Sequence, residues 1–172
     1  FRSKIKKYIY RQSQKGSKIF INNDDYFLSS LKKYSESIKT FGSNSDANYS
    51  YKLINLTNKK SYFNFLVGKK ILFKNLSTNL LGEHNVQNLT AVLSIIDDLG
   101  YKIKKSHILS FRGTKRRMNI LGKLKKTIFI DDYAHHPTEI EKLINVISLY
   151  KKKNVCLIIE PHRYSRLNDL YG

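Results

Sequence analysis

Residues 131–139 read Asp131-Asp132-Tyr133-Ala134-His135-His136-Pro137-Thr138-Glu139 and connect two segments with different apolar patterns. The segment before them, 127–130, is short and made of β-branched and aromatic residues, which predicts a buried strand. The segment after them has apolar residues at positions 140, 143, 144 and 147, the spacing of one face of a helix. Thr138 is the expected N-cap of this helix, with Glu141 completing a capping box.

A second apolar segment, 155–159, follows the helix and predicts another strand. A strand, a helix and a strand in this order form a βαβ unit, whose two strands are parallel. Ligands of open parallel sheets bind beyond the carboxyl ends of the strands. We therefore expect one crevice to be lined by the polar residues that follow both strands: Asp131, Asp132, His135, His136, His162, Arg163 and Arg166. The two arginines can share a helix face and pair with a carboxylate or a phosphate.

The composition indicates a chain with a substantial core and a basic surface. It has 172 residues, 41% of them hydrophobic, and no apolar run near the ~20 residues of a membrane span. No signal peptide is evident, and the single Cys156 excludes an intrachain disulfide and fits the cytoplasm. The net charge of +19 comes from lysines spread along the whole chain. We interpret it as solvated surface and expect neither a nucleic-acid nor a membrane partner.

The N-terminal part alternates between helical and extended patterns. We expect helices over 1–12 and 25–33, strands over 18–21 and 37–42, and an antiparallel meander over 49–76. A further helix opens at residues 83–85, with Leu89, Val92, Leu93 and Ile96 as its buried face. Ser106 is the expected cap of a short helix over 107–110. Glycine and charge then interrupt the pattern, which predicts a domain boundary near Thr114.

Four segments resemble motifs of one family, the Mur ligases, which are ATP-dependent amide-forming enzymes of peptidoglycan precursor synthesis. The segments are Gly82-Glu83-His84-Asn85-Val86-Gln87-Asn88, Phe111 to Arg117 (F-x-G-x-x-R-R), Asp131 to Glu139, and Pro161-His162-Arg163-Tyr164-Ser165-Arg166. They stand in the order and spacing of the family. The resemblance implies an α/β fold in which residues 1–113 are the C-terminal part of the central ATP-binding domain. Residues 114–172 are then the start of a Rossmann-like, amino-acid-binding C-terminal domain.

The resemblance also implies roles for individual residues. His84 and Asn85 match the pair that contacts adenine, Arg117 matches the arginine that reaches the ATP phosphates from the hinge, and Asp132 matches a residue at the nucleotide end of the C-terminal domain. The positions that hold an incoming L-alanine correspond to the following residues: Tyr133, His135, Arg163 and Arg166. Arg117 and His135 are the candidate catalytic residues, and His135 either orients the substrate or accepts a proton from its amine.

The reaction that the resemblance implies uses ATP and Mg²⁺ to activate the carboxylate of UDP-N-acetylmuramate as an acyl phosphate, which the amine of L-alanine then attacks. Met118-Asn119 departs from the usual hinge sequence of the family, and Ala134 replaces a usual glycine. Alanine at that position also occurs in a sibling enzyme that recycles a murein tripeptide. The segment from Pro161 to Arg166 favours the L-alanine reaction over this alternative.

The chain contains no G-x-x-x-x-G-K-[ST] loop for the ATP phosphates. We therefore expect an internal segment of a ligase, inactive alone, with the Mg²⁺ ligands upstream. The adjacent histidines show no recurring metal-ligand spacing, so we predict no metal site within the segment. A catalytically dead binding module is the alternative from another class. We favour the enzyme because a binding module would tolerate loss of the converging charges, whereas Asp132, His135, Arg163 and Arg166 are all present.

Overall fold

The computed structural model describes residues 2–160 of the chain. These residues form two compact units, one up to Phe111 and the other from Arg112 onward, and each unit is described by itself. No helix within 2–160 is long and apolar enough to cross a membrane.

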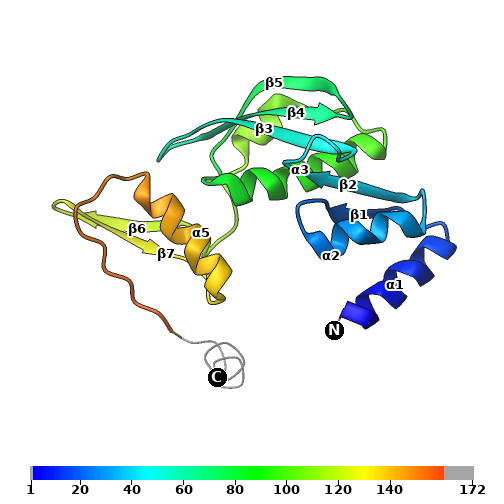
Figure 1. Ribbon diagram of the computed structural model, residues 1–172. Coiled ribbons are helices and arrows are strands. Elements are labelled where there is room, and N and C mark those ends of the chain that lie inside the picture. Colours follow the sequence, from blue (N-terminus) through cyan, green and yellow to red (C-terminus); the bar gives the residue numbers. More distant parts are fainter. Residues whose placement is uncertain (1, 161–172) are drawn as a thin grey trace. The chain divides into compact units, whose positions relative to one another are not determined.

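The first unit is built on a five-stranded sheet in the order β1-β2-β3-β4-β5 (Figure 1). The strands are β1 (Ile19–Asn22), β2 (Ile38–Gly42), β3 (Tyr49–Leu56), β4 (Ser61–Val67) and β5 (Lys70–Thr78). β1, β2 and β3 pair in parallel, whereas β3, β4 and β5 pair antiparallel. The predicted meander is therefore confirmed, and it extends a parallel sheet.

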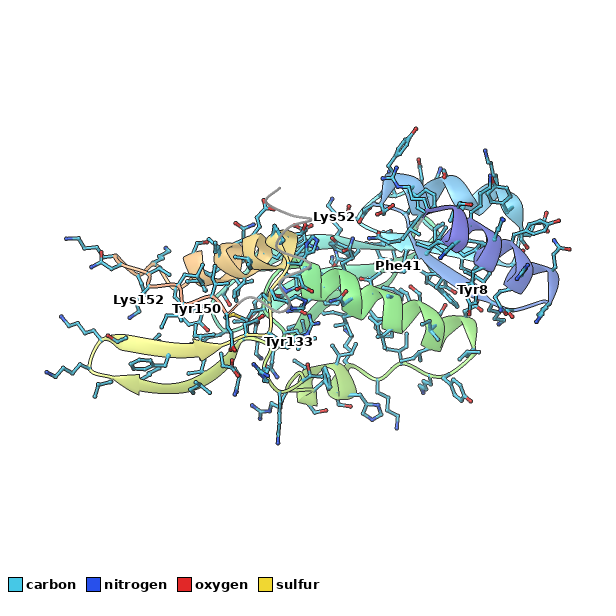
Figure 2. All side chains as sticks on the ribbon, turned by 90° about the horizontal axis from the view of Figure 1, so that it is seen from below. Tyr8, Phe41, Lys52, Tyr133, Tyr150 and Lys152 are labelled. Atoms are coloured by element: carbon cyan, nitrogen blue, oxygen red, sulfur yellow. The ribbon has the colours of Figure 1, made fainter. Side chains whose placement is uncertain are left out.

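Helices cover both faces of this sheet. They are α1 (Arg2–Gln14), α2 (Tyr26–Ser29), the 3₁₀ helix η1 (Ser30–Tyr34), α3 (Glu83–Asp98) and α4 (Lys105–Ser110). Successive side chains of a strand point to opposite faces. In β1, Ile19 and Ile21 pack in a cluster with residues of α1, α2 and η1, while Phe20 packs in the cluster beneath α3. Phe41 of β2, labelled in Figure 2, belongs to this second cluster.

The larger core lies between α3 and strands β3 to β5. Phe63 and Phe65 of β4 are 0% exposed, and Val86 and Leu93 of α3 pack against them. The predicted buried face of α3 was wrong for Val92, which is half exposed. The buried face of α3 includes two hydroxyl side chains, and its buried residues are Val86, Thr90, Leu93 and Ser94.

The hydroxyl groups explain this difference. Thr90 donates to the Val86 carbonyl at 2.8 Å and Ser94 donates to the Thr90 carbonyl at 2.6 Å. Each hydroxyl is satisfied inside the helix, which removes most of the cost of burying it. The prediction for α4 also needs a correction, because its N-cap is Lys104, without a side-chain cap bond, and Ser106 lies inside the helix.

The second unit contains an antiparallel hairpin of β6 (Asn119–Leu124) and β7 (Thr127–Asp131), followed by α5 (Pro137–Ser148). β7 confirms the strand predicted over 127–130, but the prediction that this strand is buried was wrong, since Phe129 is 49% exposed. β6 was not predicted: most of its residues are exposed, so its sequence lacks an alternating apolar pattern. Lys125 turns the hairpin with a φ of 52°.

The strand predicted over 155–159 is wrong for this structure, and so is the parallel pairing of a βαβ unit. Residues 155–159 have no regular secondary structure, and Ile158 is 92% exposed. The described ladder of β7 is formed with β6. An apolar run becomes a strand only where a neighbouring strand satisfies its backbone groups, and the described part of this unit supplies none.

Candidate functional site

The loop that follows β7 is organised by the carboxylate of Asp132. One oxygen accepts the backbone N–H of Met118 at 2.7 Å, and the other accepts the N–H of Ala134 at 2.8 Å. The first bond ties the loop to the segment that enters β6, and the second fixes a turn within the loop. Asp132, predicted to lie at the nucleotide end of the unit, therefore already holds two backbone groups.

Arg116 lies beside this loop. Its backbone carbonyl accepts the N–H of Tyr133 at 2.8 Å, and its guanidinium lies 5.2 Å from the centre of the Tyr133 ring. Arg116 Nε is 3.6 Å from a carboxylate oxygen of Asp131. Arg116 and Met118 both have positive φ, at 59° and 49°. The neighbours of Arg117 are thus fixed on both sides in a conformation that costs free energy for residues other than glycine.

Tyr133 and His135 form an aromatic pair in the same loop (Tyr133 is labelled in Figure 2). Their ring centres are 5.0 Å apart at an interplanar angle of 70°. Nδ1 of His135 lies 2.9 Å from the Tyr133 carbonyl oxygen and 3.8 Å from a carboxylate oxygen of Glu139. A carbonyl can only accept, so Nδ1 carries the proton in this hydrogen bond, and the neutral ring then has its lone pair on Nε2.

The helix α5 begins two residues earlier than predicted. His136 is the N-cap, Pro137 occupies the first helical position, and Glu139 completes the capping box in place of Thr138 and Glu141. Proline suits the first position because it has no N–H to leave unsatisfied and its φ is already helical. The four-residue capping box therefore begins at His136, the second residue of the histidine pair, and not at Thr138.

Glu139 links this helix start to the loop. Its carboxylate accepts the N–H groups of His135 and His136, both at 3.3 Å. Partial burial opposes ionisation of Glu139, but these two hydrogen bonds, with the charges of His135 and Arg117, outweigh it and lower its pKa. Glu139 was predicted only as the last residue of the loop. The signal that identifies its role is its position three residues after an N-cap.

A cavity of about 930 Å³ lies next to the loop within the second unit. Its polar lining includes Asp132, Tyr133, His135 and Arg116, and its apolar lining comes from β7, α5 and residues 155–159. The cavity is thus bordered by three predicted site residues, Asp132, Tyr133 and His135, and by Arg116, the neighbour of the predicted Arg117. Arg163 and Arg166, with His162, lie outside the described residues, so their convergence on this space remains a prediction.

The first unit holds the predicted adenine pair at the start of α3. Gly82 is the N-cap, buried and with a φ of 90°, and it provides no side-chain cap. Nδ2 of Asn85 donates to the Leu81 carbonyl at 2.7 Å, which fixes the side chain in the first turn. His84 and Asn85 are both partly exposed. An amide and an imidazole at a helix start can hydrogen-bond the edge of a base.

Comparisons with known proteins agree with the motifs. The family model of the Mur ligase middle domain matches residues 3–96, and that of the Mur ligase, glutamate ligase domain matches residues 116–170. The chain is similar to the UDP-N-acetylmuramate–L-alanine ligase of Pelagibacter ubique, with 39% identity over 87% of this chain and 33% of the relative. The chain spans about a third of the length of the curated relatives it matches.

Solved structures show the same similarity. The UDP-N-acetylmuramate–alanine ligase of Thermotoga maritima matches with a TM-score of 0.69 and 26% identity, over 88% of this chain and 35% of that one. The MurF ligase of Thermotoga maritima, in complex with ADP, matches with a TM-score of 0.60 over 75% of this chain and 30% of that one. At 17% identity the second match shows the fold alone.

Proposed function

Because the chain belongs to the Mur ligase family, we propose that it serves the ATP-dependent joining of L-alanine to UDP-N-acetylmuramate, in the cytoplasm. The observation that carries the proposal is the loop over 131–139, in which a carboxylate, a tyrosine and a histidine are fixed beside one cavity. Relatives named for this reaction, at 35–39% identity, support it.

In the second unit, we assign the L-alanine to Tyr133 and His135, with Arg163 and Arg166 pairing with its carboxylate. The hydrogen bond from Nδ1 to the Tyr133 carbonyl leaves Nε2 of His135 as the basic nitrogen. His135 is then suited to accept a proton from the attacking amine. This favours the base over the pure positioning role that the sequence left open.

In the first unit, we assign the adenine of ATP to His84 and Asn85. The bond between Asn85 and Leu81 supports the assignment because it fixes the amide before the nucleotide arrives. Arg117 is assigned to the transferring phosphoryl group, where a cation stabilises charge that develops in the transition state. The two fixed residues on either side of it restrict the directions that its side chain can take.

Mg²⁺ accompanies ATP in the proposed reaction, but the described residues do not fit it. Within 2–160, no group of three or more His, Cys, Asp and Glu side chains is arranged to hold a metal ion. We therefore assign no residue of this chain to Mg²⁺ and derive no step from it.

The direct test measures ADP release by the native protein. We expect release only when UDP-N-acetylmuramate and L-alanine are both present, and no faster release when murein tripeptide replaces L-alanine. A preference for the tripeptide would support the sibling activity. Nucleotide binding without ADP release under any of these conditions would support the binding module instead.

The role of His135 is tested with two substitutions. His135→Asn retains a donor near the position of Nδ1, whereas His135→Gln places a neutral amide near the position of Nε2. If His135 is the base, both variants lose the acidic limb of the pH profile of kcat, and kcat falls by roughly 100-fold or more. An unchanged profile in His135→Asn would show that the residue only positions the substrate.

A further inference from the structure

The carboxylate of Asp24 connects three segments of the first unit. Asp24 follows β1, and it accepts the backbone N–H of Ser43 at 2.8 Å and the Ser43 hydroxyl at 3.1 Å. Its Oδ2 also accepts Nε2 of Gln87, on α3, at 2.7 Å. One exposed side chain thus joins the end of β1, the loop after β2 and the start of α3.

Asn22 reinforces the same junction. Its Oδ1 accepts the backbone N–H of Asp24 at 2.9 Å and lies 3.4 Å from Nε2 of Gln87. Gln87 therefore directs its amide nitrogen at two acceptors that belong to one turn. The turn over 22–25, whose asparagines and aspartates are typical turn residues, thus has a specific partner on the helix.

Gly42 leaves the space that this arrangement needs. A Cβ at position 42 would lie 2.6 Å from Oδ1 and 2.8 Å from Cγ of Asp24. Such distances are far below van der Waals contact, so any side chain at 42 would displace the carboxylate. The backbone of β2 and the position of Asp24 are thus matched to each other.

The start of α3 depends on contacts of this kind. Gly82 contributes no side-chain cap, and the first turn carries His84 and Asn85. Two side chains near the start of α3 bond to other parts of the unit: Gln87 donates to the turn at Asp24, and Glu83 accepts from the Tyr51 hydroxyl at 3.1 Å. Gln87 lies three residues after His84, close to one helical turn.

We propose that Asp24 is a positioning residue for the nucleotide: through Gln87 it holds the first turn of α3 and so sets the orientation of His84 and Asn85. The inference rests on the proposed assignment of adenine to these two residues. Asp24 itself contacts no substrate in this account. Its carboxylate suits the task because an ionised acceptor forms stronger hydrogen bonds than a neutral one.

The test uses the native protein and an exchange of charges. Asp24→Ala removes the acceptor, and Gln87→Glu places two carboxylates against each other. The double variant Asp24→Asn with Gln87→Glu restores one donor and one acceptor with their positions exchanged. Asp25→Ala is the matched control, because Asp25 is the next carboxylate in the chain and caps α2 through a 2.8 Å bond from the Leu28 N–H.

Two quantities are measured for each variant: hydrogen exchange of the amides of residues 85–88, and the KM for ATP beside the KM for L-alanine. We expect Asp24→Ala and Gln87→Glu to speed the exchange and to raise the KM for ATP by roughly tenfold, with the KM for L-alanine unchanged. The double variant should recover most of both effects. The control should change neither.

Three results would overturn the proposal in distinguishable ways. Unchanged exchange at the start of α3 in Asp24→Ala would show that the carboxylate does not hold the helix. Faster exchange without a change in the KM for ATP, while His84→Ala and Asn85→Ala raise it, would leave Asp24 with a structural role alone. An unchanged KM for ATP in His84→Ala and Asn85→Ala would remove the adenine assignment itself, and the inference with it.

Discussion

Phe63 is the side chain whose truncation should cost the first unit most. It is 0% exposed and lies in β4, between β3 and β5 and beneath α3. A buried aromatic side chain removes roughly 150–250 Å² from water, and at about 25 cal/mol per Å² this contributes about 4–6 kcal/mol. Alanine keeps only its methyl group. Phe63→Ala should therefore lower the free energy of unfolding of this unit by about 3–5 kcal/mol.

Native-state hydrogen exchange of the slowest amides in β3 to β5 is the suitable assay, because it reports the opening of this unit without a probe in the other. Each 1.4 kcal/mol corresponds to about tenfold, so protection should fall by roughly two to three and a half orders of magnitude. Tyr62→Ala is the control, since Tyr62 precedes Phe63 on the opposite face of β4 and is partly exposed. A loss below about tenfold in Phe63→Ala, or an equal loss in the control, would refute the reasoning.

Three further predictions concern hydrogen bonding and pH. The lowered pKa of Glu139 means that its carboxylate stabilises α5 above the unfolded value of about 4.3. This stabilisation is lost as the pH falls through the lower folded pKa, so amide protection in α5 should decline there, and Glu139→Gln should abolish the decline. Asp132→Ala should speed exchange of the Met118 and Ala134 amides by roughly tenfold, measured by NMR. Burial, followed by nearby carboxylates, raises the pKa of Tyr49 to about 12, so its contribution to stability is complete below pH ~10 and is lost toward pH 12. Tyr49→Phe should remove the ionisation near pH 12 that this tyrosine contributes to an ultraviolet titration.

The sequence predicted those strands and helices that are determined by the pattern of their own residues. The meander over β3 to β5 follows from alternating side chains separated by turn residues, and the structure has it. The prediction placed the start of α5 two residues too late, because both His136 and Thr138 are followed three residues later by a glutamate and so fit the capping-box pattern. Pro137 decides between them, since its missing N–H fits the first helical position.

Elements that depend on distant partners were not predictable in the same way. β6 exists because it pairs with β7, and its exposed residues carry no pattern of burial. Conversely, the apolar run over 155–159 is not a strand, because the described structure gives it no partner. Strand formation in both cases depends on a neighbour, which the periodicity of one segment does not report.

In the candidate site too, local features were predicted from the sequence and features that depend on distant contacts were not. The motifs located the loop over 131–139 and the start of α3. The residue types of these motifs predicted that both segments carry charged and hydrogen-bonding side chains. The bond between Asp132 and the backbone of Met118 spans fourteen residues of sequence, and the positive φ of Arg116 occurs at a residue that rarely adopts it. The assignments of individual residues to substrates therefore remain predictions, to be tested by the kinetic experiments above.

The division of β1 between two cores restricts how the gene can change in length. Loss or gain of a single codon within 19–22 would move Phe20 to the face of Ile19 and Ile21 and expose each core to the wrong side chains. Residues 99–102, in the connection between α3 and α4, are exposed and carry no such constraint. Natural variants of this protein should therefore accumulate insertions and deletions in that connection, while β1 keeps a constant length and changes only by substitution.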